Sequence, residues 1–225
     1  MAETNPEREA AGRGPAGSRV LVWDLPLRLC HWGFALAVAG SFTTHYLSPA
    51  AFEWHVRFGW ATLALVLFRL AWGAIGPRYA RFGSFFQGAG LAHTPLGALM
   101  AIALIACLLA QSLTGLFSND EVLDAGPLAG WLSLRASNRV SGWHGTVSNL
   151  VLAAVIVHVG AALFYRVRRR DDRITPLVTG YKGAGLPASG IGSQRPGRAV
   201  VAALLIVAGL AWLAWHAPPP LDLAP

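Results

Sequence analysis

The chain has 225 residues, of which 54% are hydrophobic and 13% are charged, and its formal net charge at pH 7 is +7. This apolar content exceeds what one soluble core usually needs, so the composition predicts a membrane protein. The basic excess does not indicate nucleic-acid binding, because Lys and Arg are grouped in alternate loops between apolar segments. The two cysteines, Cys30 and Cys107, fall in no paired-cysteine motif, which argues against iron–sulfur clusters and structural disulfides.

Several segments of the chain are too polar or too rich in glycine and proline to cross a membrane. Residues 1–18 have no apolar run and are predicted to form a disordered tail, not a cleaved signal peptide. Residues 183–198 contain "GAGLPASGIGSQRPG" and predict a flexible linker. Residues 217–225 are predicted to be a short tail.

The rest of the chain contains apolar windows of the length that a bilayer requires, about 20 residues for a helix. Five windows qualify, at 27–48, 54–75, 94–117, 142–165 and 199–216. The predicted fold class is all-α: an integral-membrane four-helix bundle over residues 19–182, followed by a fifth C-terminal transmembrane helix over 199–216.

The basic residues alternate from loop to loop in a way that predicts the orientation in the membrane. They precede the first window, lie between the second and third, and are densest after the fourth, in "YRVRRRDDR". The loop near 49–53 and the tail 217–225 contain no Lys or Arg. Because positive loops stay inside, we expect a cytoplasmic N-terminus and an outer C-terminal tail. The basic run after the fourth window is expected to face anionic membrane lipid.

Two histidines in the fourth window suggest a functional site. His144 and His158 are 14 residues apart, a separation that advances a helix by about 21 Å and returns to within about 40° of the same face. An imidazole in hydrocarbon is costly and is a functional candidate by default. The simpler reading, that each histidine makes a structural hydrogen bond, explains one histidine near a helix end better than a pair on one face.

The predicted orientation supplies each of these histidines with a partner. His31, near the start of the first window, is at the depth of His158, and His55, at the start of the second window, is at the depth of His144. Two facing imidazoles in an apolar bundle suit the two axial positions of a b-type haem. With both axial positions filled, the chemistry left is one-electron transfer.

His45 leaves the ligand set open on spacing alone. It is 14 residues from His31 and at the outer level, so it could replace His55. We favour His55, because Gly59 follows it by four residues, where a missing side chain can admit a ring. His93 lies at a predicted helix start with Thr94 and Pro95, which suggests a structural role.

Between about Arg19 and Lys182 the sequence resembles the bacterial cytochrome b561 family, which includes the b-type cytochrome subunits of nickel–iron hydrogenases. The resemblance is carried by "VWDLPLRLCHWGFA", "HVRFGWATLALVLFRLAWGAIGPRYARF", "HTPLGALM", "LTGLFSND", "WHGTVSNLVLAAVIVHVG" and "LVTGYK". It implies a four-helix core that binds two b haems and passes electrons between the quinone pool and a partner at the outer face. By motif, the implied axial ligands are His31, His55, His144 and His158.

The sequence therefore predicts a membrane dihaem b-type cytochrome that exchanges electrons with a quinone. Its other partner would be a periplasmic redox protein, such as a c-type cytochrome or a hydrogenase-like subunit, or a small oxidant or reductant. A second hypothesis is a histidine-lined transporter of divalent metal ions. The absence of acidic residues from the interior of the windows argues against it. A third hypothesis is a redox-inactive membrane anchor, which leaves the matched depths of the histidines unexplained.

Overall fold

The computed structural model describes residues 19–47, 51–86, 94–120, 124–183, 191 and 193–219. The predicted tail 1–18, residues 184–190 and 192 of the predicted linker 183–198, residues 220–225 of the outer tail and His93 lie outside the described residues.

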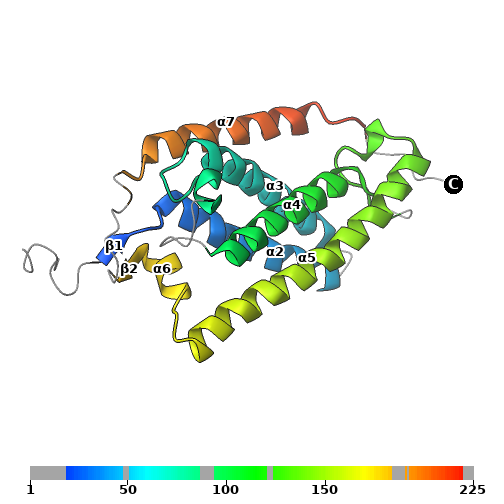
Figure 1. The fold of residues 1–225 in the computed structure, drawn as a ribbon. Coiled ribbons are helices and arrows are strands. Elements are labelled where there is room, and N and C mark those ends of the chain that lie inside the picture. The colour runs from blue at the N-terminus through cyan, green and yellow to red at the C-terminus, as the bar shows by residue number, and fades with distance from the viewer. Residues whose placement is uncertain are drawn as a thin grey trace, which may run out of the picture.

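The described chain is dominated by five long helices joined by short elements (Figure 1). The long helices are α2 (Leu25–Leu47), α3 (Phe52–Ile75), α4 (Pro95–Phe117), α5 (Leu134–Arg168) and α7 (Pro196–Trp215). The short elements are β1 (Arg19–Leu21), η2 (Phe82–Phe86), η3 (Ala129–Trp131), α6 (Ile174–Thr179) and β2 (Tyr181–Gly183).

Four of the described helices, α3, α4, α5 and α7, are long and apolar enough to cross a membrane. Helix α2 has 23 residues, as many as α4, but is not among them. Its polar side chains, which include Arg28, His31 and His45, lower its hydropathy. The predicted class of helical, multi-pass membrane protein is therefore confirmed, whereas the count of five spans stays a prediction.

Local capping explains where α4 and α5 begin. The Thr94 side chain accepts a hydrogen bond from the Gly97 backbone N–H at 3.2 Å, with Pro95 in the first turn, as the sequence predicted. Helix α5 starts at Leu134, eight residues before the predicted window 142–165. Ser133 caps α5 by accepting from Ala136 N–H. The polar stretch that follows could not be recognised as helix from hydropathy.

The helices pack in a partly open ring. Close packing joins α2 to α3, α3 to α4, and α4 to α5, and α7 lies against α3. In the core, Val66 of α3, Leu108 of α4 and Val151 of α5 form one buried cluster. Among the described residues, α5 is not closely packed along α2 or α3. This spacing has consequences for the functional site.

The two ends of the predicted bundle domain meet in a small sheet. β1 pairs antiparallel with β2, with Arg19 opposite Gly183, and Val22 N–H donates to the Gly180 carbonyl at 2.9 Å. Gly180 adopts a left-handed backbone, with φ of 89°, that ends α6. We call this end of the molecule, with β1, β2 and α6, the β1–β2 end; the α4–α5 connection lies at the opposite end (Figure 1).

A buried hydrogen bond joins the start of α2 to α3 at the β1–β2 end. The Trp72 indole Nε1–H donates to Asp24 Oδ2 at 2.7 Å, and these residues are 0% and 1% exposed. Replacing Trp72 with Phe leaves a buried carboxylate without this donor, which costs about 1–3 kcal/mol. We expect a lower midpoint of thermal unfolding in detergent for Trp72→Phe. The control Trp215→Phe, at an 86% exposed site, should match the wild type; equal losses in both variants would contradict this role.

Candidate functional site

Four histidines project from three helices into the bundle. His31 belongs to α2, His55 to α3, and His144 and His158 to α5. All four side chains are half-buried. Helix α5 thus contributes one imidazole at each of two levels, and a different helix faces it at each level.

The imidazoles lie in two pairs. The ring centroids of His31 and His158 are 6.2 Å apart with an interplanar angle of 48°. Those of His55 and His144 are 6.3 Å apart with an angle of 84°. The structure therefore brings together the same two pairs that helix periodicity and depth suggested from the sequence.

The backbone of neighbouring helices orients the His55–His144 pair. His55 Nδ1 lies 2.9 Å from the Ser41 carbonyl of α2, and His144 Nδ1 lies 3.1 Å from the Gln111 carbonyl of α4. In each case the carbonyl can only accept, so the imidazole donates from Nδ1. The Nε2 atom is then the electron-pair donor. This is the arrangement in which a histidine binds a metal with one nitrogen while its other nitrogen is held.

Helix α4 holds His144 without supplying a histidine of its own among the described residues. Thr114 Oγ1 lies 3.2 Å from His144 Nδ1, and its own hydroxyl donates to the Ala110 carbonyl at 2.7 Å. Gln111 Nε2 lies 3.1 Å from His144 Nε2. Sequence reasoning missed Gln111 and Thr114. The available signal was their polarity within the otherwise apolar run "IALIACLLAQSLTGLF".

The His31–His158 pair has fewer polar contacts. His31 Nδ1 is buried and has no hydrogen-bond partner, and the edge of the Trp32 ring lies against the imidazole, with centroids 5.4 Å apart. Buried polar atoms are normally satisfied, so the His31 Nδ1 is an exception among the described residues.

His45 and His216 lie at the periphery. The His45 side chain is exposed, with its ring centroid 5.9 Å from that of His55. Three imidazoles therefore gather at this level, and distance alone does not choose between His45 and His55. His55 is more buried and is held by Ser41, which favours it. His216 Nδ1 lies 2.9 Å from the Trp212 carbonyl and takes no part in either pair.

The helices leave room beside the paired imidazoles. A side-chain carbon added at Gly59, Gly145 or Gly160 would meet no atom within 4 Å. Gly59 lies one turn from His55, Gly145 follows His144, and Gly160 is two residues from His158. Gly145 and Gly160 are exposed, whereas Gly59 is half-buried. Of these three positions Gly59, together with the wider spacing of α5 from α2 and α3, best suits a flat group bound between helices.

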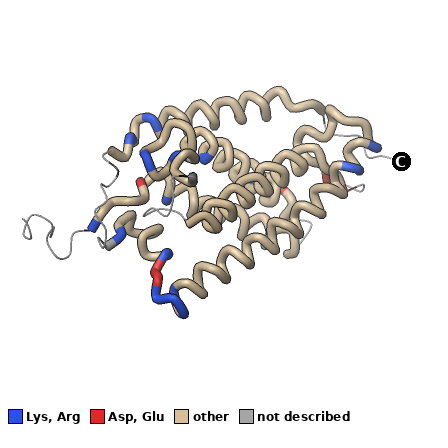
Figure 2. Tube along the Cα trace, viewed as in Figure 1, with Lys and Arg blue, Asp and Glu red and all other residues tan. Residues whose placement is uncertain are grey.

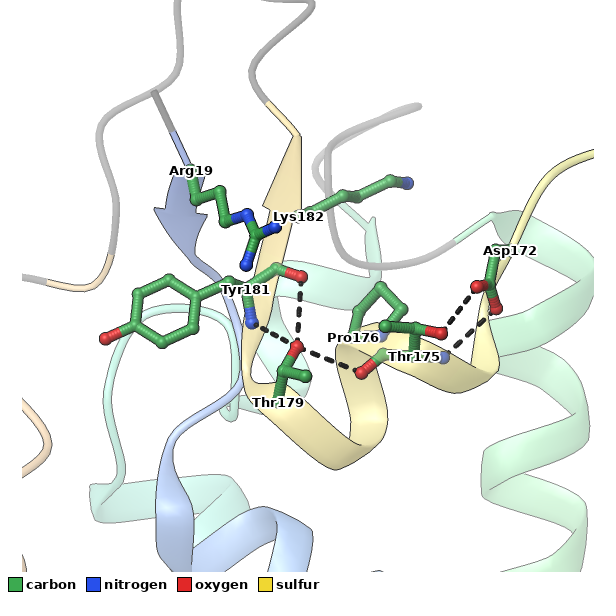
Figure 3. Close-up of a pocket in the computed structure, with 7 residues that line it drawn as sticks. All are labelled: Arg19, Asp172, Thr175, Pro176, Thr179, Tyr181 and Lys182. Carbon is green, nitrogen blue, oxygen red and sulfur yellow. Dashed lines mark hydrogen bonds between the residues drawn. The ribbon is translucent and has the colours of Figure 1, made fainter. Parts of the chain in front are cut away.

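A separate cavity of about 250 Å³ lies at the β1–β2 end, lined by Arg19, Asp172, Thr175, Pro176, Thr179, Tyr181 and Lys182 (Figure 3). Its hydrogen bonds are internal to the fold. Asp172 accepts from the backbone N–H of Ile174 and of Thr175 at 3.0 Å, and these bonds, with that from the Thr175 hydroxyl, hold the pKa of Asp172 below its usual value. We interpret this cluster as the cap that starts α6, not as a functional site.

Half-buried histidines of α2 and α3 paired with those of α5, in a chain with four described helices apolar enough to span a bilayer, define a class: a multi-pass helical membrane protein with an internal bis-imidazole site. The sequence profile of one family, prokaryotic cytochrome b561, matches residues 22–180. The chain belongs to the prokaryotic cytochrome b561 family, whose members are membrane b-type cytochromes that transfer electrons. No curated protein and no solved structure gave a significant match.

The geometry of the two pairs fits the haem that this family binds. A metal held between two imidazoles requires ring centroids about 6 Å apart, since each metal–nitrogen bond is about 2 Å and each ring centre lies roughly 1 Å beyond. The observed separations are 6.2 Å and 6.3 Å. The open position at the half-buried Gly59, one turn from His55, is also consistent with a bound haem.

Gly115 of α4 gives a test of the His144 position. A Cβ at Gly115 would lie 2.9 Å from His144 Cε1, so Gly115→Ala must displace the ring. We expect haem affinity at this level to fall roughly 10–100-fold, as for disturbed ligand supports, measured by haem absorbance per protein after purification. The matched control is Gly142→Ala, where the added carbon meets nothing within 4 Å. Full haem content in Gly115→Ala would show that α4 does not fix this imidazole.

Proposed function

We propose that this chain is a dihaem b-type cytochrome of the bacterial inner membrane that transfers electrons between the quinone pool and a partner at the outer face. The partner would be a periplasmic redox protein, such as a c-type cytochrome or a hydrogenase-like subunit, or a small oxidant or reductant. The observation that carries the proposal is the presence of two facing imidazole pairs, one at each end of the same stretch of α5.

In this proposal the four histidines are the axial ligands. His31 and His158 hold one haem, and His55 and His144 hold the other. Ser41, Gln111 and Thr114 fix the tautomer and orientation of the second pair through Nδ1. Bound haem b supplies a reversible one-electron iron couple. The chain contributes the ligand geometry, the apolar surroundings and the separation of the two levels, about 21 Å along α5.

The charge distribution supports a cytoplasmic β1–β2 end. Lys and Arg gather at this end of the molecule, around β1, α6 and the ends of α3 and α5, whereas fewer lie at the opposite end (Figure 2). By the positive-inside rule the first pair, His31 and His158, would then be near the cytoplasm. The pair formed by His55 and His144 would be near the outer face, within reach of a periplasmic partner.

The alternative of a divalent-metal transporter has less support from the ligand set. Among the described residues, no three His, Cys, Asp or Glu side chains converge as they would at a metal-ion site. Zinc in proteins usually takes three or four protein ligands. One facing pair of half-buried imidazoles at each level instead matches an iron whose other four positions are filled by a porphyrin. A redox-inactive anchor would require no matched pairs at all.

The decisive measurement is the haem content of the purified protein. We expect a reduced b-type spectrum and a ratio near two haems per chain, because there are two bis-imidazole sites. The pyridine haemochrome assay measures this ratio, with metal analysis of the same sample. A colourless protein that binds zinc would contradict the cytochrome proposal and favour the divalent-metal transporter.

Two single substitutions separate His55 from its neighbour. His55→Ala should lose one haem and leave the second, because it removes a ligand that Ser41 holds in place. His45→Ala, at the exposed position, should retain both haems. Haem stoichiometry and the number of redox transitions measure the effect. Loss of one haem in His45→Ala, with both haems kept in His55→Ala, would instead assign the outer ligand to His45.

A further inference from the structure

The cytoplasmic end of the bundle places one buried and one half-buried guanidinium group near one buried carboxylate. Arg69 of α3 is 7% exposed, and Asp24, directly before α2, is 1% exposed. Arg28 of α2 is half-buried. Two ionised guanidinium groups against one carboxylate leave at least one positive charge without a counter-ion. A buried charge is stable only when it is paired or well hydrogen-bonded.

Arg69 has no anionic partner among the described residues. Its Nη1 is buried and makes no hydrogen bond, and no carboxylate lies within ion-pair distance. The guanidinium carbon lies 4.7 Å from the Phe82 ring centroid and 5.8 Å from that of Phe85. These cation–π contacts offset part of the desolvation cost but leave the N–H group unsatisfied.

Asp24 does not accept a hydrogen bond from the buried Arg69 Nη1. Its carboxylate accepts from Trp72 Nε1. Burial raises the pKa of Asp24, and the Trp72 hydrogen bond and the nearby charges of Arg69 and Arg28 oppose that rise. Arg28 donates from Nη1 to the Val178 carbonyl, while its Nε is buried without a partner. Both arginines therefore retain a buried N–H that needs an acceptor.

Arg69 lies on the inner face of α3, near the level of His31. It is 14 residues after His55, on a stripe of α3 that includes the buried residues Thr62 and Val66. Cys30, the neighbour of His31, has its Sγ 3.6 Å from the Leu65 carbonyl, one turn before Arg69. A lipid headgroup is a poor match for this position, because the side chain faces the bundle and not the membrane surface.

We propose that Arg69, assisted by Arg28, is a carboxylate-binding site, and that the carboxylate is a propionate of the haem held by His31 and His158. The inference rests on the proposed function. Haem b has an apolar ring with carboxylates at one edge, and the guanidinium fork suits a carboxylate with two parallel N–H donors. Arg69 would then fix the orientation of that haem and favour its reduced form, because a nearby positive charge stabilises the added electron.

The test compares redox titrations and infrared spectra of purified holoprotein. Arg69→Gln removes the charge at similar size, Arg69→Lys retains it without the fork, and Arg28→Gln probes the second arginine. Arg57→Gln is the matched control, since Arg57 is exposed, at the other end of α3, and paired with Glu53. His31→Ala identifies which redox transition belongs to the cytoplasmic haem. Redox-difference infrared spectra with haem labelled by ¹³C at the propionate carboxyls report on the carboxylate directly.

Arg69→Gln should lower the midpoint potential of the redox transition that His31→Ala removes. The midpoint potential of the second redox transition should stay unchanged. A roughly tenfold change in the reduction equilibrium corresponds to about 59 mV for one electron. Arg69→Lys should largely keep the potential but shift the labelled carboxylate band. If Arg69→Gln loses the haem altogether, a shift of the labelled carboxylate band in Arg69→Lys and in Arg28→Gln tests the proposal instead.

Two negative results are distinguishable. A wild-type protein without haem would overturn the proposed function. A wild-type protein with two haems, whose labelled carboxylate band and potentials are the same in Arg69→Gln, Arg69→Lys and Arg28→Gln, would overturn this inference alone and leave Arg69 as a packing partner of Phe82.

Discussion

The fold depends on one constraint: imidazoles inside an apolar bundle must be satisfied by other helices, because the bilayer offers them no water. Helix α5 contributes His144 and His158 on one face, and α2 and α3 each turn a histidine toward it at 6.2–6.3 Å between ring centroids. Helix α5 is accordingly not closely packed along α2 or α3. Helices that face one another across paired imidazoles cannot also pack their backbones together at that level.

The helices that do pack closely support the histidines. Helix α4 packs along α5 and orients His144 through the Gln111 carbonyl and Thr114, with Gly115 leaving the ring its space. Helix α2 packs along α3 and orients His55 through the Ser41 carbonyl. The two close helix pairs therefore hold one imidazole each. Close packing within each helix pair fixes the positions of the imidazoles, and the wider spacing between the pairs leaves room beside them.

The distribution of charge separates the two ends of the protein. Most Lys and Arg residues surround the β1–β2 end, where the antiparallel contact of β1 with β2 and the Asp24–Trp72 hydrogen bond tie the start of the bundle to residues after α5 and to α3. Arg69 differs from these surface residues because it is buried. Its Nη1 is buried without a hydrogen-bond partner, and the proposed propionate contact rests on this observation.

The sequence alone determined the helical membrane class and the start of α4 at Thr94 and Pro95, and it favoured the pairing of four histidines while leaving His45 as an alternative to His55. Hydropathy, capping and the 3.6-residue period are local properties of the chain. It also carried the family resemblance that the profile match confirms. The tertiary structure decided what local patterns do not encode: the early start of α5 at Leu134, the carbonyls that hold His55 and His144, and the burial of Arg69. Backbone carbonyls are present at every residue, so only the packing of helices distant in sequence selects the ones that meet an imidazole.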